Sequence, residues 1–134
     1  MTTPSYAALL NEREVIPPGT EPYFGVRNYV FQDFMRDRLE KIPFDPPWYL
    51  LAYPDVAEAI TNGQVADAQT HFVMFGYYEH RMPRPIEVDA DWYCKAYPDV
   101  EKAVQRGHFA SPQDHFNQYG YREGRLPHAQ FSLS

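Results

Sequence analysis

The chain has very little cysteine and no concentrated positive charge. Cys94 is the single cysteine among 134 residues, so no disulfide can form within the chain. Lys and Arg form no cluster, and the formal net charge is -6. A surface that follows nucleic-acid phosphates carries a basic patch, so nucleic acid is not expected as a partner. No segment approaches the roughly 18 consecutive apolar residues of a membrane span, so none is predicted.

Short sequence motifs of several common enzyme classes are also missing. The sequence contains no Gly-rich phosphate loop, no Gly-x-Ser-x-Gly, no His-Glu-x-x-His and no Cys-x-x-Cys. Asp89 and Asp91 begin like an acidic calcium loop, but the series stops at Tyr93 and lacks the later glycine and glutamate. We therefore predict no catalytic residue, no metal site and no cofactor, and we expect that the chain is not an enzyme.

The first residues carry no export signal that we recognise. Residues 1–6 lack both the positive start and the apolar run of a signal peptide, so the expected location is the cytoplasm. Cys94 aligns with Leu50 in the repeat described below, which favours a small, buried apolar group over a nucleophile.

Aromatic residues and proline are abundant. The chain has 11 Tyr, 9 Phe, 2 Trp and 13 Pro. Such a composition predicts an aromatic core in which many rings keep a polar edge near water, and proline divides the chain into short elements.

The most informative feature is an internal repeat. Residues 44–83 align with residues 88–127 at a constant offset of 44, without a gap and with 19 identities over 40 positions. The longest match runs from Trp48 to Val56 and from Trp92 to Val100. Repetition at a period of roughly 20 to 50 residues is typical of stacked helical units that serve binding or scaffolding.

The segment before the repeat is predicted to contain a leader and one long helix. Residues 1–23 form a leader that either docks on the domain or is loose. Residues 24–43 form an amphipathic helix that ends at Pro43 and covers the open face of the first repeat. Its apolar stripe consists of Phe31, Phe34, Met35, Leu39 and Ile42.

Each repeat is predicted to contain three short helices. The first follows an Asp N-cap, Asp45 or Asp89, and the second begins at Tyr-Pro-Asp and ends at Gly63 or Gly107. The third starts at Asp67 or Ser111 and stops at Gly76 or Gly120. The predicted fold is all-α: two tandem three-helix repeats of 44 residues, at 44–87 and 88–127, with an N-terminal capping helix and a tail at 128–134.

The repeat pattern resembles that of a known bacterial helical repeat. Its shared features are Asp-x-x-Trp-Tyr, Tyr-Pro-Asp-Val and His-Phe followed by Gly and Glu-x-Arg. That repeat is found in tandem beside glycosyltransferases, sugar-related methyltransferases and some large secreted proteins, without being catalytic itself. The resemblance implies a helical module that accompanies the assembly of bacterial cell-surface polysaccharide. The first copy has His80 where the family has glycine, and the second copy has Gly124.

Several repeated polar residues have two interpretations. His71 and His115 are either structural histidines that bond a carbonyl or carboxylate between helices, or catalytic or metal-binding residues, although a zinc site needs three or four ligands. Asp55 and Asp99 are either first-turn helix residues or paired carboxylates for acid–base chemistry. Glu79 with Arg81, and Glu123 with Arg125, are predicted to form ion pairs, and an anion clamp is the alternative.

A candidate binding surface follows the third helix of each repeat. Tyr77 and Tyr121 come after the glycine that ends this helix and are expected to be partly exposed. Trp48 and Trp92 are predicted to lie in the core, with stacking on sugar rings as the alternative. The candidate surface comprises Tyr77, Tyr78, Arg81, Tyr121, Arg122 and Arg125.

The sequence therefore predicts a non-catalytic protein–protein interaction or scaffold module. The expected partner is another protein, either a larger enzyme or a second copy, because only Ala129, Phe131 and Leu133 are available to cover the second repeat. Glycan binding by exposed aromatic and arginine side chains is the alternative.

Overall fold

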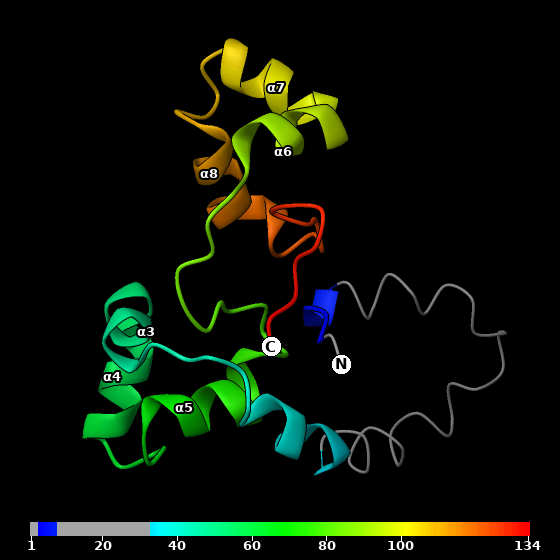
Figure 1. Cartoon of the computed structure of the whole chain (residues 1–134). Coiled ribbons are helices and arrows are strands. Elements are labelled where there is room, and N and C mark those ends of the chain that lie inside the picture. Colours follow the sequence, from blue (N-terminus) through cyan, green and yellow to red (C-terminus); the bar gives the residue numbers. More distant parts are fainter. Residues whose placement is uncertain (1–2, 8–32) are drawn as a thin grey trace, which may run out of the picture.

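The structure, a computed structural model, describes residues 3–7 and 33–134. Every regular element in these ranges is helical (Figure 1), so the all-α prediction is confirmed for the described part of the chain. Within the same ranges, no helix has both the length and the apolar character that crossing a membrane requires.

The first group of helices lies within residues 44–83, here called the first lobe. Its elements are α3 (Pro46–Ala52), α4 (Pro54–Thr61), α5 (Ala68–His71) and the π-helix η2 (Phe72–Gly76). The α-helices pack on one another around buried Tyr49, Val56 and Phe72.

The second group lies within residues 88–127, the second lobe, and has elements of the same lengths. They are α6 (Ala90–Ala96), α7 (Pro98–Gln105), α8 (Pro112–His115) and the π-helix η3 (Phe116–Gly120). Tyr93, Val100 and Phe116 occupy its core, each fully shielded from solvent.

The predicted caps of the first and third helices are confirmed in both lobes. A side-chain oxygen of Asp45 accepts a hydrogen bond from the Trp48 amide at 3.1 Å, and Asp89 does the same for Trp92 at 3.2 Å. Asp67 caps α5 and Ser111 caps α8. Such caps satisfy backbone N–H groups that have no partner inside the helix.

The third helix of each lobe ends at Gly76 or Gly120 as predicted, but the form of its last turn was not predicted. The chain widens into a π-turn over its last five residues, and Tyr77 and Tyr121 continue in right-handed helical geometry. Gly76 is required there because a Cβ atom would clash with the hydroxyl of Tyr49, and Gly120 meets Tyr93 in the same way. These glycines permit close approach and do not supply a left-handed cap.

Only part of the predicted helix 24–43 lies in the described ranges. Residues 33–39 are helical and are followed by a turn, so this helix ends before Pro43. Met35, Leu39 and Ile42 are buried as predicted, but Phe34 is 68% exposed. Met35 and Leu39 are four positions apart and lie on one helix face, and Phe34 is turned away from that face by one residue. Ile42 lies beyond the end of the helix. Phe31 and the leader residues 8–23 lie outside the described ranges.

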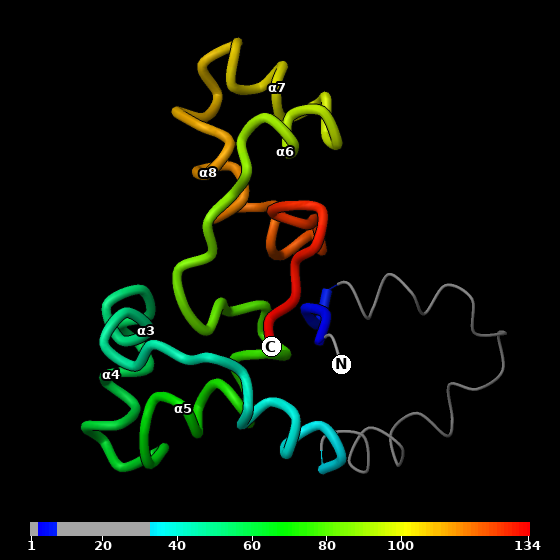
Figure 2. The backbone as a smooth tube through the Cα atoms, in the orientation of Figure 1, coloured from blue at the N-terminus to red at the C-terminus, as the bar shows by residue number. Residues whose placement is uncertain are grey.

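The first described residues pack against the tail, as Figure 2 shows. The Leu133 amide donates to the Thr3 carbonyl at 3.0 Å, and the Thr3 amide donates to the Ser132 hydroxyl at 2.9 Å. Thr3, Ser5 and Leu133 are buried. The described part of the leader is therefore docked, and the tail is part of the folded body.

Each lobe is closed by a backbone hydrogen bond between its two ends. The Asp45 amide donates to the Pro83 carbonyl at 3.1 Å, and the Asp89 amide donates to Pro127 at 3.0 Å. Among the described helices, contacts occur within a lobe and not between lobes. The lobes meet instead through extended segments and the Tyr121 hydroxyl, which donates to the Arg81 carbonyl at 3.4 Å.

Candidate functional site

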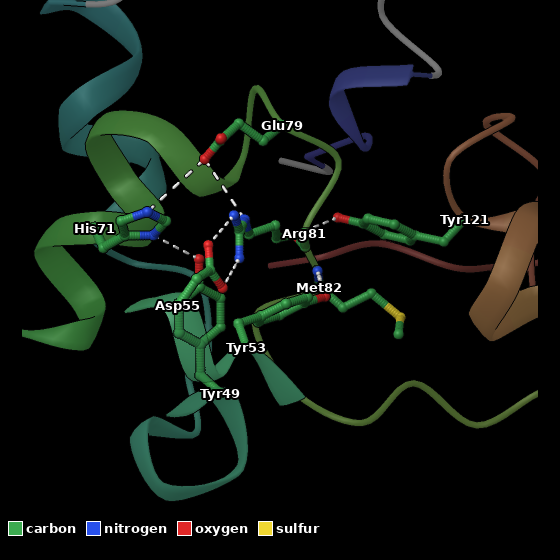
Figure 3. A network of polar contacts seen from close by, with 8 residues as sticks. All are labelled: Tyr49, Tyr53, Asp55, His71, Glu79, Arg81, Met82 and Tyr121. Atoms are coloured by element: carbon green, nitrogen blue, oxygen red, sulfur yellow. Dashed lines mark hydrogen bonds and ion pairs between the residues drawn. The ribbon is translucent and has the colours of Figure 1, made fainter. Parts of the chain in front are cut away.

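A polar network connects the helices of the first lobe to the segment that leaves it (Figure 3). The Arg81 guanidinium donates two hydrogen bonds to the Asp55 carboxylate, at 2.8 and 2.6 Å. It lies 4.9 Å from the centre of the Tyr53 ring, and its Nε is 3.5 Å from a Glu79 oxygen. The Tyr53 hydroxyl accepts a hydrogen bond from the Met82 amide at 2.8 Å, so α4 and the outgoing chain are held together.

A histidine extends this network into the core. Nδ1 of His71 is 2.9 Å from the Tyr49 hydroxyl, and Nε2 is 3.8 Å from Glu79. Burial raises the pKa of Tyr49, so this phenol keeps its proton and donates to Nδ1. The imidazole proton is then on Nε2 and faces the Glu79 carboxylate.

The second lobe repeats the network with nearly the same geometry. Arg125 donates to both oxygens of Asp99 at 2.9 and 2.8 Å and lies 4.9 Å from the Tyr97 ring centre. Its Nε is 2.8 Å from Glu123, and Nδ1 of His115 is 2.9 Å from the Tyr93 hydroxyl. The predicted ion pairs Glu79–Arg81 and Glu123–Arg125 are therefore confirmed.

The charges in these networks favour a fixed structure. The hydrogen bonds from Arg81 lower the pKa of Asp55, and those from Arg125 lower the pKa of Asp99. Burial lowers the pKa of His71 and of His115, which favours neutral imidazoles. Each arginine, aspartate, glutamate and histidine of these networks thus has a partner within its own lobe.

The series Tyr49, His71, Glu79 has the form of a nucleophile, a base and an orienting acid. The Tyr49 side chain is fully buried and its hydroxyl lies against Gly76, so no substrate atom can reach it. The raised pKa of Tyr49 also opposes the phenolate that a nucleophile requires. The arrangement is one of structural hydrogen bonds, although the histidine bonds a phenol and not the carbonyl or carboxylate that we expected.

The candidate binding surface must be corrected at Tyr77 and Tyr121. Tyr77 is 0% exposed and Tyr121 is 3% exposed, where partial exposure was expected. Both rings turn inward because the chain keeps helical geometry after the glycine. Their hydroxyls donate to backbone carbonyls, Tyr77 to Pro4 and Tyr121 to Arg81.

The other four residues of that surface have different environments. Arg81 and Arg125 are held by Asp55 and Asp99, so their guanidinium groups are already bound. Tyr78 is half-buried, burial raises its pKa to about 12, and its buried hydroxyl has no hydrogen-bond partner in the described part of the chain. Arg122 is exposed and forms no ion pair with any described residue.

A cavity of about 330 Å³ lies between the lobes, here called the inter-lobe pocket. The first lobe contributes Tyr53, His80 and Arg81 to its lining, and the second contributes Asn117, Tyr121 and Arg122. His80 was not part of the predicted binding surface, although a difference between the copies marks a position where function is expected. Its difference from Gly124 in the second copy was visible in the sequence, but its place in a cavity depends on how the lobes meet.

Two exposed aromatic side chains were also missed. Phe75 and Tyr119 occupy equivalent positions in η2 and η3, and each is 48% exposed. They follow the core residues Phe72 and Phe116 by three positions, a spacing at which a regular α-helix brings side chains close to one face. The π-turn changes the angular spacing, so residues three apart no longer face the same way.

The single thiol and the acidic groups form no reactive centre. Cys94 is half-buried instead of fully buried, and burial raises the pKa of its thiol, which disfavours the nucleophilic thiolate. Trp48 and Trp92 are half-buried and pack edge-on against Tyr53 and Tyr97. Over residues 3–7 and 33–134, no three His, Cys, Asp or Glu side chains gather as a metal site would require.

Comparison with known proteins finds no match at any level: no family model, no curated protein and no solved structure is similar to this chain. The functional argument therefore depends on the geometry above.

Proposed function

We propose that the chain is a non-catalytic protein-interaction module built from two tandem repeat units. The units are residues 44–87 and 88–127, and the helix whose described part is residues 33–39 covers the first. Support comes from the equal lengths of α3–η2 and α6–η3 and from matching hydrogen bonds at equivalent residues, such as Asp45 to Trp48 and Asp89 to Trp92.

The observation that carries the proposal is that the repeated arginine, aspartate, glutamate and histidine side chains of the two networks bind partners inside their own lobes. Arg81 and Arg125 bind aspartates of their own lobes, and His71 and His115 bind buried phenols. A site for chemistry needs reactive groups that a substrate can reach. These groups stabilise the lobes, and the remaining exposed surface is suited to recognition.

The side chains best placed for contact with a partner are Phe75 on the first lobe and Tyr119 on the second. They stand at equivalent positions on the two lobes and leave about half of each ring exposed. Aromatic side chains supply much of the binding energy at protein interfaces. The chain carries 18 acidic and 12 Lys or Arg residues, so the partner that fits is a protein with a basic surface around an apolar pocket.

The proposed biological setting depends on the resemblance of the repeat pattern alone. The bacterial repeat that it resembles accompanies glycosyltransferases, and we infer that the partner is a larger enzyme of bacterial cell-surface polysaccharide assembly, in the cytoplasm. Self-association is the competing arrangement, because the second lobe is covered less completely than the first. Leu126 of the second lobe is 37% exposed, whereas its counterpart Met82 in the first lobe is 7% exposed.

Affinity capture followed by reconstitution tests the proposal. The immobilised chain is exposed to a lysate of the source organism, and each captured protein is purified and titrated by calorimetry. The double variant Phe75→Ser, Tyr119→Ser should weaken binding at least about tenfold, as expected for interface aromatics. Leu51→Ser is the matched control, because Leu51 is 83% exposed elsewhere on α3.

Two further measurements are the dependence of binding on salt and the oligomeric state of the chain. Binding to a basic surface should weaken between about 50 and 300 mM salt, because screening reduces attraction between exposed charges. Analytical ultracentrifugation separates self-association from binding to another protein. A captured protein that binds the double variant as tightly as the unmodified chain would refute the aromatic surface.

The alternative of glycan binding loses most of its original residues. Tyr77 and Tyr121 are buried, and Arg81 and Arg125 are held in ion pairs. Arg122 is the residue of the candidate surface that keeps a free charge among the described residues.

A further inference from the structure

Residues 3–7, here called the strap, are bound against the end of the first lobe and the tail. Every second residue of the strap, beginning with Thr3, is buried, and Pro4 and Tyr6 are half-buried. A short segment outside the helical core is poorly ordered unless contacts tie it down. The contacts of the strap therefore show what kind of segment this site accepts.

One hydrogen bond of the strap has a counterpart where the two lobes meet. The Tyr77 hydroxyl donates to the Pro4 carbonyl at 3.0 Å, and the equivalent Tyr121 hydroxyl donates to the Arg81 carbonyl at 3.4 Å. Pro4 and Arg81 both belong to non-helical segments that precede the lobe whose tyrosine they bind. At the first lobe, the strap thus has the place that the segment around Arg81 has at the second lobe.

Aromatic rings line the site that holds the strap. The Tyr6 ring lies 5.7 Å from the ring of Tyr77 and meets the ring of Tyr78 edge-on at 5.0 Å. It also stacks on the imidazole of His80 at 5.7 Å. Aromatic grooves are a recurring docking site for proline-containing segments, because such segments are rigid before they bind. We call the three residues Tyr77, Tyr78 and His80 the strap site.

The aromatic part of the strap site exists on the first lobe alone. The second lobe has Arg122 and Gly124 where the first has Tyr78 and His80. His80 has a φ of 62°, in the left-handed region that suits glycine. A histidine in this conformation is strained, and strained residues gather at functional sites. The fold of the lobe does not require a ring at this position, because the second lobe forms with glycine there.

The strap leaves part of its site unsatisfied. The Tyr78 hydroxyl and Nδ1 of His80 are buried without a hydrogen-bond partner among the described residues, and both rings contact Tyr6. Burial of a polar atom without a partner is unfavourable. The gain from packing Tyr6 on these rings is therefore partly offset, which favours exchange of the strap for another segment.

The tail binds the strap mainly through its backbone. The Leu133 amide donates to the Thr3 carbonyl at 3.0 Å, and the Thr3 amide donates to the Ser132 hydroxyl at 2.9 Å. Bonds to a backbone group do not distinguish one side chain from another at residue 3. Selection between segments must therefore come from Pro4 and Tyr6.

We propose that the strap site binds a proline-containing segment of a partner protein, in which an aromatic residue follows the proline by two positions. The strap occupies the site as an internal competitor. The partner's proline carbonyl accepts from the Tyr77 hydroxyl, and its aromatic ring takes the place of Tyr6. This inference rests on the proposed function, because it gives the interaction module a further contact, but it uses neither Phe75 nor Tyr119.

Competition between the strap and a peptide provides the test. The probe is the peptide Thr-Pro-Ser-Tyr-Ala, which has the sequence of residues 3–7 and is titrated into the full chain by NMR. A tethered strap competes at a high effective concentration, so the unmodified chain should bind the probe weakly. Tyr6→Ser weakens the competitor, and this variant should bind the probe at least tenfold more tightly, with a dissociation constant of about 0.1 to 1 mM.

Two further changes localise the site. Adding Tyr77→Phe to Tyr6→Ser removes the hydroxyl that binds the proline carbonyl and should weaken binding about fivefold. The peptide Thr-Ala-Ser-Ser-Ala lacks both the proline and the ring and should bind about tenfold more weakly than the probe. Adding Leu51→Ser to Tyr6→Ser is the control and should leave binding unchanged, because Leu51 is exposed on α3, away from the contacts of the strap.

The unmodified chain gives a measurement that does not depend on the fold of a variant. Unlabelled probe is added in excess to isotope-labelled chain, and the signals of the Tyr6 ring are followed. They should move to the values of an unbound tyrosine, because the probe and the strap cannot occupy the same site together.

Three outcomes overturn the proposal. The first is equal affinity of the unmodified chain and Tyr6→Ser for the probe, and the second is full binding after Tyr77→Phe is added. The third is a Tyr6 ring whose signals do not move in excess probe. Failure of peptide binding leaves capture through Phe75 and Tyr119 untouched. Failure of capture while peptide binding is intact counts against that aromatic surface alone, so the two proposals fail separately.

Discussion

At the scale of single residues, the glycines at the ends of η2 and η3 are set by a neighbouring phenol. Gly76 lies against the Tyr49 hydroxyl and Gly120 against that of Tyr93, and neither has a positive φ. The sequence shows that these glycines recur, but not why. A glycine that ends a helix and a glycine that makes room for a neighbouring side chain look the same in a sequence. Only the packed structure distinguishes the two roles.

Replacing these glycines should therefore be costly. We expect Gly76→Ala or Gly120→Ala to lower the free energy of unfolding by about 2–4 kcal/mol, because a buried hydroxyl must move. Gly63→Ala is the control: it has a φ of 73° and open space around it, so it should cost only about 1 kcal/mol. Urea unfolding at pH 7 measures both, and equal losses at Gly63 and Gly76 would refute the packing argument.

The buried histidines predict a dependence of stability on pH. Burial lowers the pKa of His71 and His115 in the folded chain, so below about pH 6.5 the unfolded chain binds more protons. Stability should therefore fall as the pH drops from 7.5 to 5.5. Urea unfolding at both pH values checks this.

Substitution assigns that effect to the two imidazoles. In the double variant His71→Gln, His115→Gln, the loss of stability between pH 7.5 and 5.5 should be markedly smaller, even if the variant is less stable overall. An unchanged pH dependence would show that other groups are responsible. His108→Gln is the control, since this histidine is exposed.

At the scale of secondary-structure elements, the arginine–aspartate pairs attach each outgoing segment to the second helix of its lobe. Arg125 reaches back to Asp99 with two hydrogen bonds, which joins residues 26 positions apart in sequence. The Asp99 side chain is 62% exposed, so solvent screening reduces the energy of the pair.

Breaking one pair tests its contribution. Asp99→Asn should lower the free energy of unfolding by about 1 kcal/mol at pH 7, allowing for screening and the two-hydrogen-bond geometry. Arg125 lowers the pKa of Asp99, so this stability is present above about pH 4 and disappears as the pH falls through the lowered pKa. Asp91→Asn, at an exposed residue of α6, is the control.

The loss of stability caused by Asp99→Asn should itself depend on pH. The unmodified chain and the variant are expected to approach equal stability as the pH is lowered below about 4. A difference that persists at low pH would mean that the carboxylate contributes through something other than its charge. Chemical denaturation across pH 3 to 7 gives the comparison.

Short helices were predictable because their signals are local. An N-cap at Asp45, proline at the first turn and glycine at Gly63 each act within a few residues. The buried position of Tyr77 was not predictable, because it depends on a π-turn that no local signal announced. The inter-lobe pocket requires the relative placement of residues 80 and 122, which the alignment of the repeats does not contain.

At the scale of the whole molecule, the two lobes depend on a shared centre and not on contact between their helices. Tyr121, Leu133 and the docked residues 3–7 lie where the lobes meet, and Leu133 is fully buried. The chain carries one tryptophan in each lobe, Trp48 and Trp92, so each lobe has its own fluorescent reporter.

These reporters test whether the lobes unfold together. In Trp48→Phe the remaining tryptophan reports on the second lobe, and in Trp92→Phe it reports on the first. Adding Leu133→Ala to either variant should destabilise the reported lobe by about 2–4 kcal/mol, because it opens a cavity in the shared centre. Leu51→Ala, at a side chain that is 83% exposed, should change stability by less than about 0.5 kcal/mol. A loss confined to one reporter would show that the lobes are energetically independent.

The hydrogen bond between Leu133 and Thr3 has a further consequence for the order of the lobes along the chain. Residues 3 and 133 are neighbours, so a short peptide could join them into a ring without disturbing either lobe. The ring could then be opened at the exposed residue Pro85, between the two lobes, which would place the second lobe ahead of the first. Such a permuted chain should keep both polar networks, because each closes within one lobe and neither crosses the new break.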